Sequence, residues 1–292
     1  KCINTKYTGK GISIAFIDTG ICKNNDFDSR IKCFYDVVNH KNYVYDDCGH
    51  GTHVAGICSG SGANSNGKYR GIAPESNIVM IKALDFVGKG TASDVLTGIQ
   101  WIADNCKKYN IRILNMSIGA GITNTKDPLV RAAEILWDMG IVVVAAAGNN
   151  GPQKGTISSP GISKKIITVG SADDINVPEN DIGKSYSGRG PTKECVIKPD
   201  VVAPGTNIIS CLCEDNKSNN YYKSLSGTSM STPIVSGAIA LLLEKAPDLK
   251  PDDIKFMLKQ SCHNLECSPN RQGWGLLDIE NLLNREVVYV RK

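Results

Sequence analysis

Four polar residues in this chain are of the types that together carry out nucleophilic catalysis. Asp18 ends the apolar stretch "GISIAFID", and His53 lies in "GHGTHVAG". Ser229 lies in "GTSMSTP", and Asn149 follows "IVVVAAAG". A serine hydroxyl is a weak nucleophile at neutral pH, so it needs an imidazole base whose tautomer a carboxylate fixes. An amide donor can stabilise the resulting oxyanion. We therefore predict a serine nucleophile that is assisted by one histidine, one aspartate and one asparagine.

The position of Ser229 fits this role because of Pro233. Proline is tolerated in the first turn of a helix, where backbone N–H groups have no intrahelical partner. Pro233 therefore places Ser229 at the entrance of a helix over about 229–246. Unpaired N–H groups and the positive end of the helix dipole favour developing negative charge at such a position. A serine that only caps the helix is the simpler alternative.

Two histidines, His50 and His53, are three residues apart and would share one face of a helix. A metal pair is one interpretation of this spacing. A zinc site needs further ligands, however, and the glutamate of the H-E-x-x-H motif is absent. We interpret His50 as a structural histidine at the helix start and His53 as the catalytic base.

Asp18 and Asn149 each have a structural alternative, because both begin good turn sequences. The Asp-Thr-Gly at Asp18 also occurs in aspartic proteases, which need two aspartates sharing a proton. The chain contains no second Asp-Thr-Gly or Asp-Ser-Gly, which excludes that class. The chain order Asp, His, Ser is one of the known orders of a catalytic triad, and it favours the triad interpretation.

The elements that must position these residues alternate between strands and helices. Continuous apolar runs predict strands at 11–18, 77–84, 111–118, 141–148 and 165–171, and helical patterns fall at about 50–60, 92–108, 127–139, 229–246 and 251–261. Apolar runs without alternation suit strands covered on both faces. We predict a doubly wound α/β fold, with a mainly parallel sheet and helices on both faces, in a single domain over 1–292. Its chemistry belongs at the carboxyl ends of the strands.

The bulk composition is that of an ordinary globular protein. The net charge of +4 is spread without a run of Lys or Arg, and no apolar stretch could cross a bilayer, so we expect neither a nucleic-acid nor a membrane partner. The chain starts at Lys1, which suggests a mature or trimmed form. The 11 cysteines include no CxxC pair. We expect mostly buried free thiols and favour a cytoplasmic over a secreted location.

The chain resembles the subtilisin family of serine endopeptidases. The matching stretches are "IAFIDTGI", "GHGTHVAGI", "LNMSIG", "VVAAAGNNG" and "GTSMSTPIVSG", together with "RGIAPESNI" and "DVVAPG", and they span roughly 9–285. The resemblance implies Asp18 as orienter, His53 as base and then acid, and Ser229 as nucleophile. It also implies an oxyanion hole formed by the Asn149 amide and the Ser229 N–H, with help from Thr228.

The resemblance further implies how a polypeptide substrate binds. It assigns Ser117, Ile118 and Gly119 to the wall of the P1 pocket, Gly88 to Gly90 to the other flank, and Ser158 to the pocket floor. A neutral P1 pocket for uncharged side chains follows. No cofactor is implied for catalysis, whereas Asp26 matches a structural calcium ligand and a pro-segment is an expected inhibitor. With its expected free cysteines, the chain resembles the intracellular branch of the family more than the secreted branch.

Two alternatives of other classes remain at this point. A catalytically inactive relative would bind peptides, although such proteins usually lose a triad residue and this chain keeps a candidate for each. An esterase or lipase would carry a G-x-S-x-G nucleophile elbow, whereas Gly227 to Ser231 reads G-T-S-M-S. The endopeptidase interpretation is favoured over both.

Overall fold

A single parallel sheet forms the centre of the protein. The structure is a computed structural model, and it describes residues 5–121, 124–173, 185–213 and 220–290. The sheet has seven strands in the order β2-β3-β1-β4-β5-β6-β7, all parallel to their neighbours. The strands are β1 (Ser13–Asp18), β2 (Ile31–Asp36), β3 (Asn77–Lys82), β4 (Ile111–Met116), β5 (Val142–Ala146), β6 (Ile167–Ser171) and β7 (Val201–Ala203). β1, β5 and β6 are buried along their whole length, which explains their unbroken apolar sequences.

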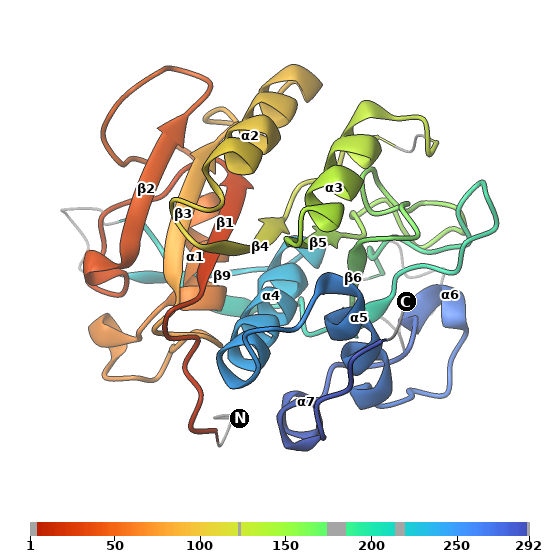
Figure 1. Ribbon diagram of the computed structural model, residues 1–292. Helices are drawn as coiled ribbons and strands as arrows, with labels where there is room; N and C mark the ends of the chain where they lie inside the picture. Colours follow the sequence, from red (N-terminus) through yellow and green to blue (C-terminus); the bar gives the residue numbers. More distant parts are fainter. Residues whose placement is uncertain (1–4, 122–123, 174–184, 214–219, 291–292) are drawn as a thin grey trace.

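Helices surround this sheet (Figure 1). They are α1 (His50–Ser59), α2 (Ala92–Asn105), α3 (Pro128–Asp138), α4 (Thr228–Lys245), α5 (Pro251–Ser261), α6 (Pro269–Gln272) and α7 (Ile279–Asn284). α2 and α3 pack against each other, and α1 and α4 form a second pair. α4 is buried on nearly all sides, so its sequence shows no polar face. The predicted doubly wound α/β fold is confirmed.

The topology places three strand ends beside one helix entrance. β1 and β4 are neighbours, and the chain runs from β1 to β2 on one side of the sheet and from β4 to β5 on the other, so this pair marks a topological switch point. Asp18 ends β1, Ser117 follows β4, and the segment after β5 leads to Asn149. α4 begins at Thr228 on the same side of the molecule, because its first turn hydrogen-bonds to residues 117 and 149.

Some elements were not expected from the sequence. A two-stranded antiparallel hairpin, β8 (Ile208–Cys211) with β9 (Tyr222–Leu225), lies in the segment that lacked a clear pattern. Its strands are short, and it packs on α1 rather than joining the central sheet. β2 and the short helices α6 and α7 were also not predicted.

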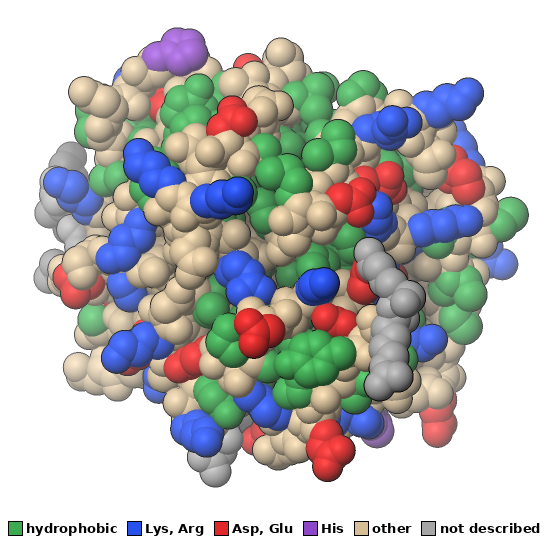
Figure 2. Space-filling view, in the orientation of Figure 1, with side chains coloured by type: hydrophobic (Ala, Val, Ile, Leu, Met, Phe, Trp, Pro, Cys, Tyr) green, Lys and Arg blue, Asp and Glu red, His purple; other side chains and the backbone are tan. Residues whose placement is uncertain are grey.

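The core and the surface agree with a globular protein. One hydrophobic cluster includes buried residues from Ile12 to Leu283, and the single domain over 1–292 remains a prediction consistent with it. No helix in the described part of the chain is long and apolar enough to span a membrane. Figure 2 shows acidic and basic side chains interspersed over one face of the molecule. The expected absence of a nucleic-acid partner stays a prediction.

Candidate active site

The best-defined pair in the site joins Asp18 to His50. Asp18 is fully buried at the end of β1, and its Oδ1 lies 2.7 Å from His50 Nδ1. The same oxygen accepts a hydrogen bond from the Thr19 N–H at 2.7 Å. A carboxylate in this position fixes the imidazole tautomer, with the proton on Nδ1 and Nε2 able to act as a base.

The electrostatic surroundings of His50 favour its charged form. Burial lowers the pKa of this imidazole, but the charge of Asp18 and its hydrogen bond raise it, with a smaller upward effect of Asp46. The net result is a raised pKa. His50 can therefore accept a proton readily, which a general base must do.

The prediction that His53 is the base is wrong in its geometry. His53 Nε2 lies 3.0 Å from the Lys223 carbonyl oxygen and 3.1 Å from that of Ile208, with no hydrogen bond to Asp18. Two carbonyls can only accept, so Nε2 carries the proton. Burial lowers the pKa of His53 to about 4, and it is neutral at pH 7.

The exchange of roles between the two histidines follows from the start of α1. The helix begins at His50, after Gly49 in the left-handed region with φ 85°. This first helical residue contacts Asp18 at the end of β1. His53 lies almost one turn further along and reaches the β8–β9 hairpin. Like Ser229, His50 stands at the entrance of a helix, and this shared position was the available signal for its role.

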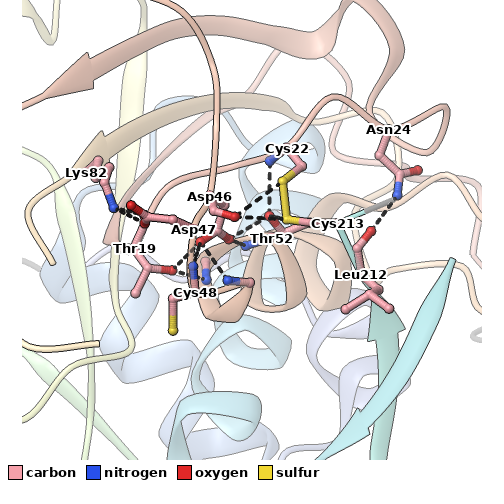
Figure 3. The surroundings of a disulfide bond; sticks show 12 residues. Thr19, Cys22, Asn24, Asp46, Asp47, Cys48, Thr52, Lys82, Leu212 and Cys213 are labelled. Carbon is pink, nitrogen blue, oxygen red and sulfur yellow. Dashed lines mark hydrogen bonds and ion pairs between the residues drawn. A yellow bond between two sulfur atoms is a disulfide. The ribbon is translucent and has the colours of Figure 1, made fainter. Parts of the chain in front are cut away.

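A further buried carboxylate, Asp46, fixes the start of α1 and was not predicted from the sequence. Its Oδ1 accepts hydrogen bonds from the Gly49 N–H at 2.7 Å and the Thr19 hydroxyl at 2.8 Å. Its Oδ2 accepts from the N–H and hydroxyl of Thr52, at 2.8 and 2.6 Å. Asp46 thus ties Thr19, directly after β1, to Thr52 in the first turn of α1 (Figure 3). Through these bonds it supports the pairing of Asp18 with His50. An aspartate shortly before a helix-start glycine was the available signal.

A disulfide bond adjoins this network. Cys22 and Cys213, 191 residues apart, are bonded, and their sulfurs lie near Asp46 and Thr52 (Figure 3). The expectation of free thiols is wrong for this pair, because folding brings the β8 end against the segment after β1. The structure describes ten cysteines, and the other eight are free. The cellular compartment stays a prediction.

Ser229 lies in the first turn of α4, as predicted from Pro233. Its hydroxyl donates a hydrogen bond to the Ser117 carbonyl oxygen at 2.9 Å, and the Ser117 hydroxyl donates to the Ser229 carbonyl oxygen at 2.9 Å. Pro233 occupies a position whose N–H would otherwise bond the carbonyl of residue 229. Ser117 therefore replaces the bond that the proline removes.

The Asn149 amide is oriented by Thr228. Its Oδ1 accepts hydrogen bonds from the N–H and the hydroxyl of Thr228, both at 3.0 Å. Because Thr228 holds the side-chain oxygen of Asn149, the orientation of the amide group is fixed, and its nitrogen lies next to Gly227. It is 3.2 Å from the point where a Cβ would stand on Gly227, whose φ is 152°. The amide donor thus lies at the entrance of α4, beside Ser229.

His50 and Ser229 line one cavity of about 610 Å³. Its walls include the predicted substrate segments, Gly88, Gly90, Ser117, Ile118 and Gly119, together with apolar side chains at Leu84, Val95 and Leu129. Cys48, a free thiol, also lines it. The structure therefore brings both flanking segments to the cavity that His50 and Ser229 line.

Ser158 does not lie in the wall of this cavity, contrary to its predicted place at a pocket floor. It is buried, and its hydroxyl accepts a hydrogen bond from the Asn150 amide at 3.1 Å. It stands behind two glycines, Gly119 and Gly148, where a Cβ would collide with it. Ser159 and Pro160 line the cavity instead.

The surroundings of Asp26 do not fit a calcium ion. Its Oδ1 accepts from the Asn64 N–H and the Tyr222 hydroxyl, each at 3.0 Å. Its Oδ2 accepts from the Gly62 N–H at 3.2 Å and from Tyr222 at 2.9 Å. These groups donate protons, whereas calcium needs oxygen ligands with lone pairs toward the ion. Within the described ranges, no group of three or more His, Cys, Asp or Glu could hold a metal ion.

The chain is similar to known proteins over most of its length. The model of the subtilase family matches residues 9–275. Serine protease AprX of Bacillus subtilis (strain 168) is 44% identical over 94% of this chain and 66% of the relative. Subtilisin DY of Bacillus licheniformis is 35% identical over 94% of this chain and 91% of the relative.

Two solved structures are similar to this chain over most of its length. A cold adapted subtilisin-like serine proteinase superimposes with a TM-score of 0.74 at 32% identity, covering 94% of this chain and 89% of that one. Sphericase superimposes with a TM-score of 0.80 at 27% identity, covering 95% and 94%.

Proposed function

Because the chain belongs to the subtilase family of serine endopeptidases, we propose that it hydrolyses peptide bonds with Asp18, His50 and Ser229 as its triad. The observation that carries this assignment is the 2.7 Å contact between Asp18 Oδ1 and His50 Nδ1. His50 lines the same cavity as Ser229. His53 is excluded from the role of base because two backbone carbonyls occupy its Nε2.

The reaction starts when the Ser229 hydroxyl turns from the Ser117 carbonyl toward His50. Its oxygen attacks the scissile carbonyl carbon while His50 Nε2 takes the proton, and Asp18 stabilises the imidazolium. The resulting oxyanion accepts hydrogen bonds from the Asn149 amide and the Ser229 N–H. His50 then protonates the leaving amine, and the C–N bond breaks to give an acyl-enzyme. Water, deprotonated by His50, attacks the ester carbonyl carbon; the bond to Ser229 Oγ then breaks, and His50 returns the proton to that oxygen as the acid leaves.

The substrate backbone lies between two segments of the cavity. Gly88 to Gly90 and Ser117 to Gly119 flank it in an extended, strand-like form. The apolar lining from Leu84, Val95 and Leu129 favours uncharged side chains on the acyl side of the scissile bond. Polypeptides are therefore the proposed substrates. A pro-segment would occupy the same cleft as an inhibitor.

Catalysis in this proposal uses protein groups alone. No step needs a cofactor, because the proton moves between Ser229, His50 and the leaving amine. Calcium is not assigned a site, since Asp26 faces hydrogen-bond donors.

Replacing each of the two histidines in a separate variant tests the assignment of the base. In a subtilisin, removal of the nucleophile or the base lowers kcat by about 10⁶. We expect losses on that scale for Ser229→Ala and His50→Ala, together with loss of fluorophosphonate labelling in Ser229→Ala. His53→Gln should keep measurable turnover in the folded protein. Hydrolysis that survives His50→Ala but not His53→Gln would overturn the triad, and no labelling of the wild type would favour a peptide-binding protein.

A further inference from the structure

We propose that Lys223 is a specificity-determining residue that makes the cleft prefer an acidic side chain at the first or second position after the scissile bond. This inference rests on the proposed endopeptidase function. It concerns the leaving-group side of Ser229, opposite to the acyl side that the proposed binding mode gives to the apolar cavity. Lys223 belongs to β9, the strand that leads through Gly227 into α4.

The ammonium of Lys223 lies next to the residue that precedes His50. It is 3.4 Å from the point where a Cβ would stand on Gly49. Lys223 is not among the residues that line the cavity shared by His50 and Ser229. The proposed binding mode gives the cavity to the acyl side of the substrate, and the ammonium, which lies next to Gly49 but outside the cavity lining, is on that ground assigned to the leaving-group side of His50.

The backbone at Lys223 is held firmly in this place by His53. The His53 imidazole donates to the Lys223 carbonyl oxygen on β9 and to the Ile208 carbonyl oxygen on β8. In return the Ser210 hydroxyl donates to the His53 carbonyl oxygen at 2.8 Å. These bonds attach both strands of the hairpin to α1. They use the backbone of Lys223, so its side chain can be replaced without removing them.

The charge of Lys223 is available to a substrate. In the described parts of the chain, no carboxylate forms an ion pair with its ammonium. The charged and titratable groups that face His50 are Asp18 from β1, Asp46 from the preceding loop, His53 from α1 itself and Lys223 from β9. Burial lowers the pKa of His50. The negative charges of Asp18 and Asp46 raise this pKa, and the positive charge of Lys223 lowers it. A cation that acts on His50 also acts on a substrate carboxylate bound beside it.

The expected selectivity is modest, because Lys223 is only partly buried. Solvent-exposed ion pairs correspond to about a twofold to fivefold change in an equilibrium or rate ratio. An aspartate or glutamate after the scissile bond gains this factor, whereas a lysine or arginine loses it by repulsion. Added salt weakens both effects, since the Debye length falls to about 3 Å at 1 M.

The test uses internally quenched peptides that share one acyl side and carry Asp, Asn or Lys at the first and second positions after the scissile bond. We expect kcat/KM of the wild type to rank Asp above Asn above Lys. Lys223→Met should abolish the ranking, and Lys223→Glu should invert it. Lys259→Met is the matched control, because Lys259 is exposed on α5 and absent from the cavity. It should leave the ranking unchanged.

A second measurement concerns the catalytic histidine directly. Removing the cation in Lys223→Met should move the acid limb of kcat/KM to higher pH for the Asn peptide, since an adjacent positive charge opposes protonation of His50. An unchanged ranking and acid limb in folded Lys223→Met would overturn this inference while peptide cleavage itself continued. Absence of cleavage of all peptides by the wild type would instead overturn the proposed function.

Discussion

His53 makes the stability of the protein depend on pH in a defined window. Its imidazole is fully buried and donates to two carbonyls through Nε2, while Nδ1 has no hydrogen-bond partner among the residues that the structure describes. Burial lowers its pKa to about 4, against about 6.5 for an exposed histidine. The unfolded chain therefore binds a proton at a pH where the folded chain does not. This contribution to stability is present above about pH 6.5 and is lost as the pH falls toward 4.

The size of this loss follows from the two pKa values. A difference of one in pKa corresponds to about 1.4 kcal/mol. Protonation of the unfolded chain at residue 53 should therefore remove about 3 kcal/mol of unfolding free energy between pH 6.5 and 4. Loss of the two hydrogen bonds in His53→Gln lowers stability at pH 7 as well, by about 1 to 3 kcal/mol. The variant lacks the titration, so its stability should fall less steeply with acidification.

Urea unfolding in a Ser229→Ala background, which prevents self-digestion, measures this difference. The unfolding free energy is compared between pH 7 and 4 for the background protein and for the same protein with His53→Gln. Carboxylates that titrate in this range contribute equally to both and cancel. His263→Gln is the control, because His263 is exposed and its replacement should leave the steep dependence intact. Equal pH dependence with and without His53 would refute the reasoning.

Three further predictions concern the supports of the site. Asp46→Ala should cost about 3 kcal/mol or more, because it leaves several buried donors unpaired, and kcat/KM should fall with it; thermal unfolding and peptide hydrolysis measure the two effects. A chelator should leave Tm unchanged, whereas Tyr222→Phe should lower stability by about 1 to 3 kcal/mol; a drop in Tm with chelator would show a calcium site. Replacing Cys22 and Cys213 by Ser should destabilise the protein by up to about 5 kcal/mol for this 191-residue separation. Reductant should then no longer affect Tm, and an equal effect of reductant on the double variant would contradict the assignment.

Local pattern in the sequence determined the fold and most of the residues at the site. Unbroken apolar runs predict strands buried on both faces, and their alternation with helices predicts the parallel sheet. In such a sheet the residues that follow the strands share one edge, so the positions of Asp18 and Asn149 follow directly. Pro233 placed Ser229 at a helix entrance by the same kind of local argument. Hydrophobic periodicity and the backbone properties of proline depend on residues that are close together in the sequence, so both can be recognised without the structure.

Only the tertiary structure decided which groups meet. His50 and His53 have the same type and lie on the same helix, and their difference is whether each faces β1 or the β8–β9 hairpin. The pairing of Cys22 with Cys213 depends on that hairpin, which carries no strong pattern of its own. Lys223 likewise meets the start of α1 across more than 170 residues of sequence. Such contacts arise from the packing of whole elements, and spacing along the chain does not encode them.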